Sequence, residues 1–517
     1  MLLAFYGDDF TGSTDALEVL TRAGARSVLF IAPPTPERLA EYPGLQAMGI
    51  AGRSRSLAPA AMETELRPAF LALRQSGARH VHYKVCSTFD SSPAIGSIGR
   101  ALEIGADIFR SRFVPVVVGA PSLGRYCLFG NLFARMGAGS NGAIYRLDRH
   151  PSMSRHPSTP AHESDLRLHL AQQTTKRMGL VDILAVEQGE AAAQAALDAS
   201  LAGGAEVVFI DLLSAGQLPV VGALLDRAGT ILSSDAARVD SDSDPAAVDS
   251  HSDQAGVHSD QPGVNSDSDT AAAKSYAEEK RRWSATSGRA ELRQPAPLFS
   301  VGSSGIEMAL TAHAAAQGQL TPVTSWPDPG IADPLLVGSG SCSPVTEAQI
   351  AKALEHGFAE VALDTAGLAD PSRAAGTEQT SIAEVLVHLR AKRSVIVHTS
   401  RGSADARLAP TAAALTKTGQ SAASAEVLGT ALGRVLRGAL AQCPVRRLII
   451  AGGDTSSYVG RGLGIEAAEM IAPLVPGAPL CRVRAPGSPA DGLQVAFKGG
   501  QVGSVDFFLT AIRGAVN

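Results

Sequence analysis

Short apolar runs alternate with amphipathic stretches along the first part of the chain. The runs have the length of buried β-strands, and each is followed by a loop rich in Gly, Ser, Thr or Pro. The predicted strands cover residues 2–6, 27–32, 47–51, 80–85, 114–118, 181–186 and 207–212. The stretches between them repeat apolar positions at the helical period, which predicts helices at 13–23, 60–75 and 95–109.

A second series of the same kind follows a proline-rich stretch. Residues 325–334 (SWPDPGIADP) indicate a connection between two domains, because prolines and turn residues interrupt both helices and strands. The strands predicted after it are 335–337, 360–363, 395–398, 448–451 and 493–497. The helices predicted between them are 345–355, 382–391 and 424–441, and one further strand, 298–301, precedes the connection.

Strands that alternate with helices form parallel sheets covered by helices on both faces. A chain of 517 residues is also too long for one compact core, since a domain has roughly 100–200 residues. We therefore predict an α/β fold of two doubly wound parallel-sheet domains with an active-site cleft between them. The first domain covers residues 1–232 and 298–325, and the second covers 334–517.

Residues 233–297 differ in kind from both series. They contain VDSDSDP and then a near-perfect seven-residue tandem, HSDQAGV–HSDQPGV–NSD, which begins at His251. A Ser/Asp-rich segment without an apolar face cannot form a core, so we predict a disordered insertion. A calcium-binding acidic tract is the less favoured alternative. The hydroxyls and carboxylates of residues 233–297 are therefore not counted among the candidate site residues.

Composition excludes several classes of function. With 45 basic and 50 acidic residues and a formal charge of −5, the chain has no strong basic field for nucleic acid or an anionic membrane. No apolar run approaches the ~18 residues of a membrane span. The five cysteines are scattered without CxxC spacing, and the start MLLAFYGDDF lacks a basic segment. We expect a cytoplasmic protein without a disulfide framework.

Carboxylates crowd the turn after the first predicted strand. Asp8 and Asp9 stand at its end, and Asp15 follows about one helical turn into the next helix. Helix capping needs only one of these acids. The group can therefore accept a hydroxyl proton, bind substrate hydroxyls or hold a metal ion, and the sequence leaves these three open.

Cations and hydroxyls follow the next strands. Arg53 and Arg55 alternate at the end of the third strand, where guanidinium groups either face solvent or bind a carboxylate or phosphate. Lys84 lies on an otherwise apolar strand and needs an anionic partner or an anionic substrate. Further polar candidates for substrate binding are Ser87, Thr88, Asp90 and His156.

The second series carries small residues at its strand ends instead. Such residues let backbone N–H groups approach phosphates, and helix N-termini favour negative charge. Three such loops in one domain indicate a nucleotide site. The candidate residues are Ser339, Ser341, Gly452, Gly453, Asp454, Thr455, Gly499 and Gly500.

Some familiar chemistries have no motif here. The dipeptide GK is absent, so there is no Walker A loop, and HExxH, GxSxG and the protein-kinase motifs are absent as well. Two other classes stay open: a different nucleotide-dependent α/β enzyme of the dehydrogenase kind, and a non-catalytic binding protein.

Several motifs, in order along almost the whole chain, resemble the four-carbon acid sugar kinases. They are DDFTG at 8–12, Ser54-Arg55, KVCSTFD at 84–90, HPSTP at 156–160, GSGSCS at 338–343 and GGDT at 452–455. The resemblance implies a sugar-acid-binding N-terminal domain, an ATP-binding C-terminal domain and transfer of the γ-phosphoryl group to a terminal hydroxyl.

The same resemblance bears on the substrate and the partners. The KVCSTFD form is more similar to the branch that acts on 3-oxo acids than to the threonate branch, and both 3-oxo-tetronate and 3-oxo-isoapionate stay open. Mg²⁺ is expected with ATP, because it neutralises phosphate charge. Metal ligands cannot be assigned, and a homo-oligomer stays open. Among the acids we predict Asp9 as the base, with Asp8 and Asp15 as substrate or structural ligands.

Overall fold

The computed structural model describes residues 1–136, 142–156, 159–239, 297–420 and 424–514, with the backbone alone at 230–239 and 454. The chain divides into two compact units, Met1–Gly229 with Pro297–Asn517, and Thr230–Ala296. Most of the predicted insertion, including its repeat, lies outside the described residues. Helix α8, Leu218–Val239, continues past the predicted boundary at residue 232, because Ala and Arg in its last turns favour a helix.

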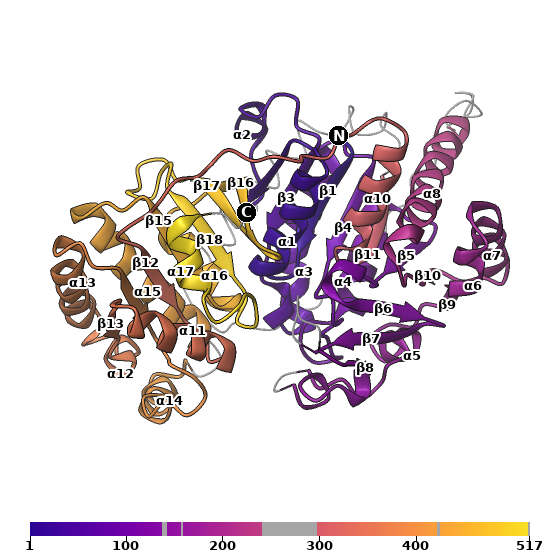
Figure 1. The fold of residues 1–517 in the computed structure, drawn as a ribbon. Coiled ribbons are helices and arrows are strands. Elements are labelled where there is room, and N and C mark those ends of the chain that lie inside the picture. Colours follow the sequence, from indigo (N-terminus) through magenta and orange to yellow (C-terminus); the bar gives the residue numbers. More distant parts are fainter. Residues whose placement is uncertain (137–141, 157–158, 240–296, 421–423, 515–517) are drawn as a thin grey trace, which may run out of the picture. The chain divides into compact units, whose positions relative to one another are not determined.

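The N-terminal half, residues 1–229 and 297–325, contributes parallel strands to one large sheet (Figure 1). In spatial order they are β2 (Ser27–Phe30), β3 (Ala47–Ala51), β1 (Leu3–Gly7), β4 (His80–Lys84), β11 (Leu298–Gly302), β5 (Val114–Val117), β10 (Val207–Ile210) and β9 (Met178–Val181). Strand β11 pairs with both β4 and β5, so the residues after the insertion complete the sheet begun before it.

The C-terminal half, residues 334–514, contributes a second parallel block. Its strands are β13 (Ala359–Ala362), β14 (Val395–His398), β12 (Leu336–Ser339), β15 (Arg447–Ala451) and β18 (Gln494–Lys498). The antiparallel strands β17 (Ala478–Arg484) and β16 (Ala467–Val475) join the blocks, because β17 pairs with β18 and β16 pairs with β2. Two sheets were predicted, and the hairpin makes them one sheet of 15 strands. The α/β fold class is confirmed.

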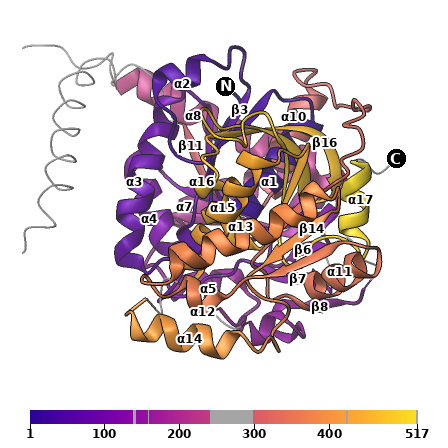
Figure 2. The ribbon, with the colours of Figure 1, turned by 90° about the vertical axis from the view of Figure 1, so that its left-hand side faces the viewer.

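Helices cover the strands of both halves. In the N-terminal half they are α1 (Phe10–Arg22), α2 (Pro36–Ala40), α3 (Pro59–Gln75), α4 (Ile98–Phe109), α5 (Leu166–Ala171), α6 (Ile183–Glu187), α7 (Glu190–Ala202), α8 and α10 (Gly305–Ala316). In the C-terminal half they are α11 (Pro344–Glu355), α12 (Thr365–Leu368), α13 (Ala374–Arg390), α14 (Leu408–Lys417), α15 (Ser424–Gln442), α16 (Gly453–Gly462) and α17 (Phe507–Arg513). Helix α13 packs against α15 on one side of that block (Figure 2).

Two local predictions differ from the structure. Residues 181–186 were predicted as a strand, but β9 ends at Val181 and α6 begins at Ile183, because the Asp182 side chain caps that helix through the Ala185 N–H. A small antiparallel sheet of β6 (Arg125–Leu128), β7 (Asn131–Arg135) and β8 (Ile144–Arg146) was not predicted.

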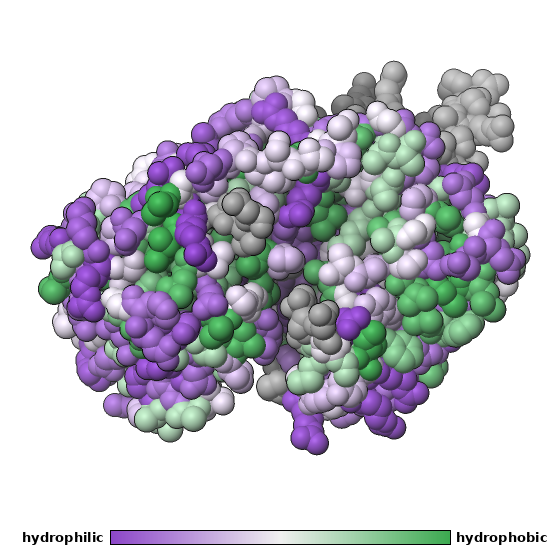
Figure 3. All heavy atoms as spheres, in the orientation of Figure 1, coloured by the Kyte–Doolittle hydropathy of each residue, from purple (hydrophilic) through white to green (hydrophobic). Residues whose placement is uncertain are grey.

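The surface is mixed in character. On the face in Figure 3, hydrophilic residues line a hollow between the N- and C-terminal halves. Across the described ranges, no helix combines the length and the apolar character needed to span a bilayer.

Candidate functional site

Asp9 lies where strand β1 gives way to helix α1. Its extended backbone makes it the N-cap of α1, and its Oδ1 accepts a hydrogen bond from the Gly12 N–H at 2.6 Å. The Thr11 hydroxyl donates to Oδ2 at 3.1 Å. Asp9 is therefore buried and held at the carboxyl end of the sheet, where parallel-sheet proteins bind ligands.

Arg55 connects the two adjacent acids. Its Nε and Nη2 donate to the two carboxylate oxygens of Asp8 at 3.2 and 3.0 Å, and its Nη1 lies 2.7 Å from Asp9 Oδ2. Burial raises the pKa of the Asp8 carboxyl to about 6, against the attraction of Arg55. Burial alone would lower the pKa of Arg55, but Asp8 and Asp9 together raise it well above its usual value. This guanidinium is thus fully engaged by carboxylates.

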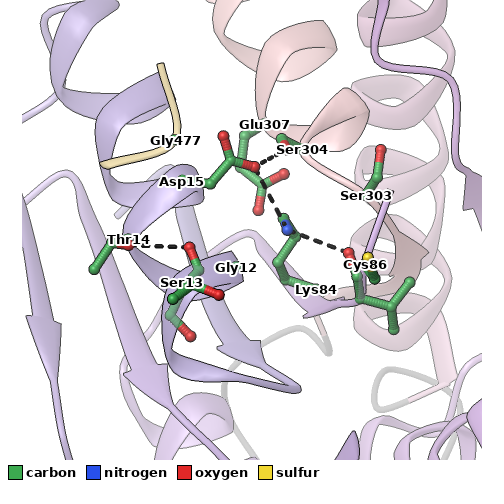
Figure 4. Close-up of polar contacts among 12 residues, drawn as sticks. Gly12, Ser13, Thr14, Asp15, Lys84, Cys86, Ser303, Ser304, Glu307 and Gly477 are labelled. Atoms are coloured by element: carbon green, nitrogen blue, oxygen red, sulfur yellow. Dashed lines mark hydrogen bonds and ion pairs between the residues drawn. The ribbon is translucent and has the colours of Figure 1, made fainter. Parts of the chain in front are cut away.

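Lys84, at the end of β4, has carboxylate neighbours too (Figure 4). Its buried Nζ donates to the Val85 carbonyl at 3.2 Å and lies 3.6 Å from Asp15 Oδ2. The hydroxyl of Ser304 donates to the same Asp15 oxygen. Burial lowers the pKa of Lys84, but the carboxylates of Asp15 and Glu307 outweigh it and the net shift is upward.

Glu307 was not singled out from the sequence. It lies on α10 close to Lys84 and Asp15 (Figure 4), and its side chain is fully buried. Neither carboxylate oxygen has a hydrogen-bond partner among the described residues, and the nearest ring nitrogen, His82 Nε2, is 3.6 Å away. Burial raises the pKa of Glu307 to about 8 and lowers that of His82 to about 3. The sequence signal that could have identified Glu307 is an acidic residue within the otherwise apolar helical sequence GIEMAL at 305–310.

The predicted glycine-rich loops lie together in the C-terminal half. Gly452 has a φ of 125° and caps α16, and a Cβ at Gly340 would lie within 3 Å of the Thr455 side chain. A Cβ at Gly500 would lie 2.8 Å from the Ser341 hydroxyl. At Gly340 and Gly500 the loops after β12, β15 and β18 are therefore packed so closely that a Cβ would require the side chains of Thr455 or Ser341 to move.

Lys498 is a second residue that the sequence prediction missed. It ends β18, is fully buried, and donates from Nζ to the Gly499 carbonyl at 2.8 Å and to the Thr346 hydroxyl at 3.0 Å. Burial lowers its pKa to about 7. Lys498 thus stabilises the loop after β18 through these hydrogen bonds. Its position directly before Gly499 was the sequence signal that could have identified it.

The acidic turn of the N-terminal half and these loops face each other. A Cβ at Gly453 would lie 3.8 Å from Asp9 Oδ2 and 3.9 Å from the Thr11 hydroxyl, and one at Gly499 would lie 3.8 Å from the same hydroxyl. A small cavity of about 10 Å³, roughly the room that one water molecule needs, lies here and is lined by residues that include Asp9, Arg53, Gly453 and Tyr458. The N-terminus of α16 is thus directed at the carboxylate that caps α1.

The remaining predicted residues divide into two groups. Arg53 lines the same pocket and pairs with Glu65 at 3.1 Å. Thr88 and Asp90 line a separate small pocket with Thr159, and the Thr159 hydroxyl contacts His156 Nδ1 at 3.0 Å.

Three predicted residues have less direct connections to this site. Ser87 is half-buried and makes no side-chain hydrogen bond within the described part of the chain. Ser339 is buried at the end of β12, and its hydroxyl accepts from the Ser341 N–H at 3.5 Å. The backbone of Asp454 belongs to α16, but its side chain lies outside the described atoms.

The described side chains at this site offer few ligands for a metal ion. Within the described ranges, no group of three or more His, Cys, Asp or Glu side chains has the arrangement that holds a metal. Asp9 and Asp8 are both engaged by Arg55. A resident metal does not fit these residues, so no step is derived through one.

Two families match successive parts of the chain. Residues 3–240 match the family of sugar-binding N-terminal domains, and residues 336–508 match the family of nucleotide-binding C-terminal domains.

Curated relatives match over nearly the full length. The chain is 38% identical to a 3-oxo-isoapionate kinase of Paraburkholderia graminis, over 98% of this chain and 93% of that one. It is 28% identical to a 3-oxo-tetronate kinase of Methylobacterium radiotolerans, over 99% of both chains. A crystal structure of a Salmonella typhimurium LT2 protein has the same fold, with a TM-score of 0.67, 22% identity and 98% coverage of both chains.

Proposed function

Because this chain belongs to the four-carbon acid sugar kinase family and is an ATP-dependent sugar acid kinase, we propose that it phosphorylates the terminal hydroxyl of a 3-oxo sugar acid. The first candidate substrate is 3-oxo-isoapionate, on which the relative with 38% identity is named to act, and the second is 3-oxo-tetronate. The KVCSTFD sequence at 84–90 supports the 3-oxo branch.

One observation carries the proposal: the glycines at the start of α16 and after β18 lie next to Asp9 and Thr11. Small residues at a helix N-terminus let backbone N–H groups approach phosphate oxygens. A carboxylate beside that point can accept the proton of a hydroxyl. Phosphoryl transfer requires positioning and charge stabilisation more than covalent chemistry, and this arrangement supplies both.

Asp9 is the proposed base. The substrate hydroxyl oxygen attacks the γ-phosphorus of ATP, the new O–P bond forms, and the bond to the β-phosphate oxygen breaks to release ADP. The hydroxyl proton passes to a carboxylate oxygen of Asp9. Arg55 holds Asp9 and Asp8 in place through its ion pairs with both carboxylates.

Asp15 and Lys84 support the same turn from the other side. Lys84 lies 3.6 Å from Asp15 Oδ2 and neutralises part of the negative charge of Asp15, and Ser304 fixes the Asp15 carboxylate. We assign them to holding the turn after β1 and to hydroxyl contacts with substrate. Thr88, Asp90, Ser87 and His156 stay predictions as outer substrate contacts.

The ATP side consists of loops rather than charged side chains. Ser339, Ser341, Gly452, Gly453, Thr455, Gly499 and Gly500 are the proposed phosphate contacts, and the Asp454 prediction is kept with them. We propose that residues 1–232 with 298–325 bind the acid and 334–517 bind ATP. Mg²⁺ accompanies ATP on its phosphate oxygens, where it neutralises charge. A cytoplasmic location, where ATP is available, and a homo-oligomer stay predictions.

An ADP-release assay tests the proposal. Purified protein is mixed with ATP, MgCl₂ and, one at a time, 3-oxo-isoapionate, 3-oxo-tetronate, threonate and erythronate. The proposal predicts acid-dependent ADP release, highest with a 3-oxo acid. Acid binding without ADP release would instead indicate a binding protein, and a change in nicotinamide absorbance would indicate a dehydrogenase.

A further inference from the structure

A second pocket adjoins the one at Asp9. Its volume is about 320 Å³, at the lower end of the ~300–1,000 Å³ typical of small-molecule sites. Arg53 lines both pockets, so they are neighbours. The second pocket also contains Glu65 and Arg461, and Arg461 comes from α16 in the C-terminal half.

The charges in this pocket are unbalanced. Arg53 pairs with Glu65 at 3.1 Å, and Glu65 also accepts a hydrogen bond from the Tyr6 hydroxyl at 3.1 Å. Arg461 is exposed to solvent, and its side chain has neither a hydrogen bond nor an ion pair within 4 Å among the described residues. Partial burial lowers the pKa of Arg461, and the single carboxylate of Glu65 does not offset that. Two guanidinium groups thus line a pocket that contains one carboxylate, and only Arg53 pairs with it.

The cations near Asp9 have the opposite surroundings. Arg55 contacts both Asp8 and Asp9, and Lys84 lies beside Asp15 and Glu307. Carboxylates outnumber cations there, so a further carboxylate would be repelled. In the second pocket cations outnumber carboxylates, so a carboxylate would be attracted and can form a fork of hydrogen bonds with guanidinium.

The walls of the second pocket fit a short carbon chain. Ile31, Ile50 and Pro68 are among the residues that line it, and Tyr6 forms part of it. Helix α16 carries Gly453 in its first turn and Arg461 eight positions later, a rise of roughly 12 Å along the helix axis. One helix therefore presents backbone N–H groups to the phosphate end of the site and a guanidinium to the far end.

We infer that Arg461, together with Arg53, binds the carboxylate of the sugar acid in this second pocket, so that its terminal hydroxyl reaches Asp9. The inference rests on the proposed kinase function and deepens it. The residue that recognises the acid comes from the nucleotide-binding half, so the acid must bridge both halves to be bound fully. An analogue of the same length without the carboxylate charge would not make the contact with Arg461 that links the two halves.

Steady-state kinetics of Arg461→Gln test the inference, with Arg393→Gln, an exposed arginine of the C-terminal half, as the matched control. We expect the KM for 3-oxo-isoapionate to rise about 10- to 100-fold, the scale of a lost charged hydrogen bond. The KM for ATP and the melting temperature should change little, and Arg461→Lys should recover part of the loss. An unchanged KM for the acid, or an equal rise in both KM values, would overturn the inference.

A substrate-side change isolates the carboxylate. The neutral amide of the acid should be a poor substrate for the wild type, and Arg461→Gln should lose most of that discrimination. Equal discrimination by the two proteins would overturn the inference. If Arg461→Gln does not fold, Arg53→Gln with the same acid and amide pair decides instead.

Calorimetric binding separates this inference from the kinase proposal. Weaker binding of the acid to Arg461→Gln than to wild type, without ATP, supports the second pocket even if no acid releases ADP. ADP release with an acid affinity that Arg461→Gln leaves unchanged supports the kinase proposal and overturns the inference.

Discussion

The two faces of the site are built by opposite means. On the N-terminal side, Asp8, Asp9 and Arg55 form a charged group whose side chains are locked by contacts of 2.7–3.2 Å. On the C-terminal side, the loops are built from glycines: a Cβ at Gly500 would lie 2.8 Å from the Ser341 hydroxyl, and one at Gly453 would face Asp9 at 3.8 Å. Charge is the constraint on one side, and volume is the constraint on the other.

Because the two sides differ in this way, substitutions on each side should affect a different step of the reaction. An isosteric change that removes charge should act on the chemical step if it is made at the acidic turn. A change that adds volume should act on nucleotide binding if it is made at the glycine loops. A protein in which both changes had the same effect would not have two distinct faces.

The largest effect is expected for Asp9→Asn. The amide can still accept the Gly12 N–H bond that caps α1, but it cannot take a proton. We expect kcat to fall by roughly 10²–10⁴, with little change in the KM for ATP. Asp107→Asn, on an exposed position of α4, is the control. Normal turnover of Asp9→Asn with slow Asp8→Asn or Asp15→Asn would move the assignment, and three active variants would refute a carboxylate base.

Gly453→Val tests the opposite face. Its Cβ would stand between the start of α16 and Asp9, and the branched methyls would occupy the space that phosphate oxygens need. We expect the KM for ATP to rise about tenfold, equivalent to ~1.4 kcal/mol, with a much smaller change in the KM for the acid. Gly376→Val is the control, since open space surrounds that glycine. A parallel rise in both KM values would point to misfolding or to a different nucleotide site.

The protonation of Glu307, on the charged side of the site, can be tested through the pH dependence of the free energy of unfolding. The folded chain keeps its proton up to a pKa of about 8, whereas the unfolded chain releases it near 4.5. Unfolding between these values therefore releases a proton, so this group makes the free energy of unfolding fall as pH rises. Lys84, His82 and Asp15 face the same carboxyl, and all three remain in Glu307→Gln.

Urea titrations from pH 5 to 8 measure this slope. Glu307→Gln should gain stability over the wild type as pH rises, while the exposed Glu384→Gln should follow the wild type. Parallel curves for wild type and Glu307→Gln would show that Glu307 does not carry the proton.

The smallest effect is expected outside both faces. Helix α8 ends at Val239 and β11 begins at Leu298, so residues 241–295 can be replaced by a short Gly-Ser linker without cutting either. Because a Ser/Asp-rich sequence without an apolar face cannot form a core, we expect kcat and the melting temperature to stay close to wild type. A large loss of activity or of soluble protein would assign the segment a role.

Much of the fold could be predicted because strands and helices alternate with clear periods. The hairpin of β16 and β17 was missed, since its pairing with β2 joins residues more than 400 positions apart and leaves no local signal. Residues 181–186 were apolar enough for a strand, yet one capping contact of Asp182 made most of them helical.

The sequence pointed to candidate site residues where strand ends carry unusual residues, as at Asp8, Asp9 and Gly453, and the structure brings these residues close together. The sequence could not say which cations were already paired. Arg55 and Lys84 were candidates for binding an anionic group of the substrate, and that role stays untested, but both are engaged by carboxylates of the chain. Arg461 lies in no motif, and only the packing of α16 brings it into a pocket with Arg53.

The position of the transferred phosphoryl group tests the central claim most directly. The protein is incubated with ATP and 3-oxo-isoapionate labelled with ¹³C at its terminal carbon, and the product is examined by ³¹P NMR. The account predicts a phosphate ester whose phosphorus couples to the labelled carbon, formed in step with ADP. Free inorganic phosphate, a phosphorus signal without that coupling, or unchanged acid beside intact ATP would contradict it.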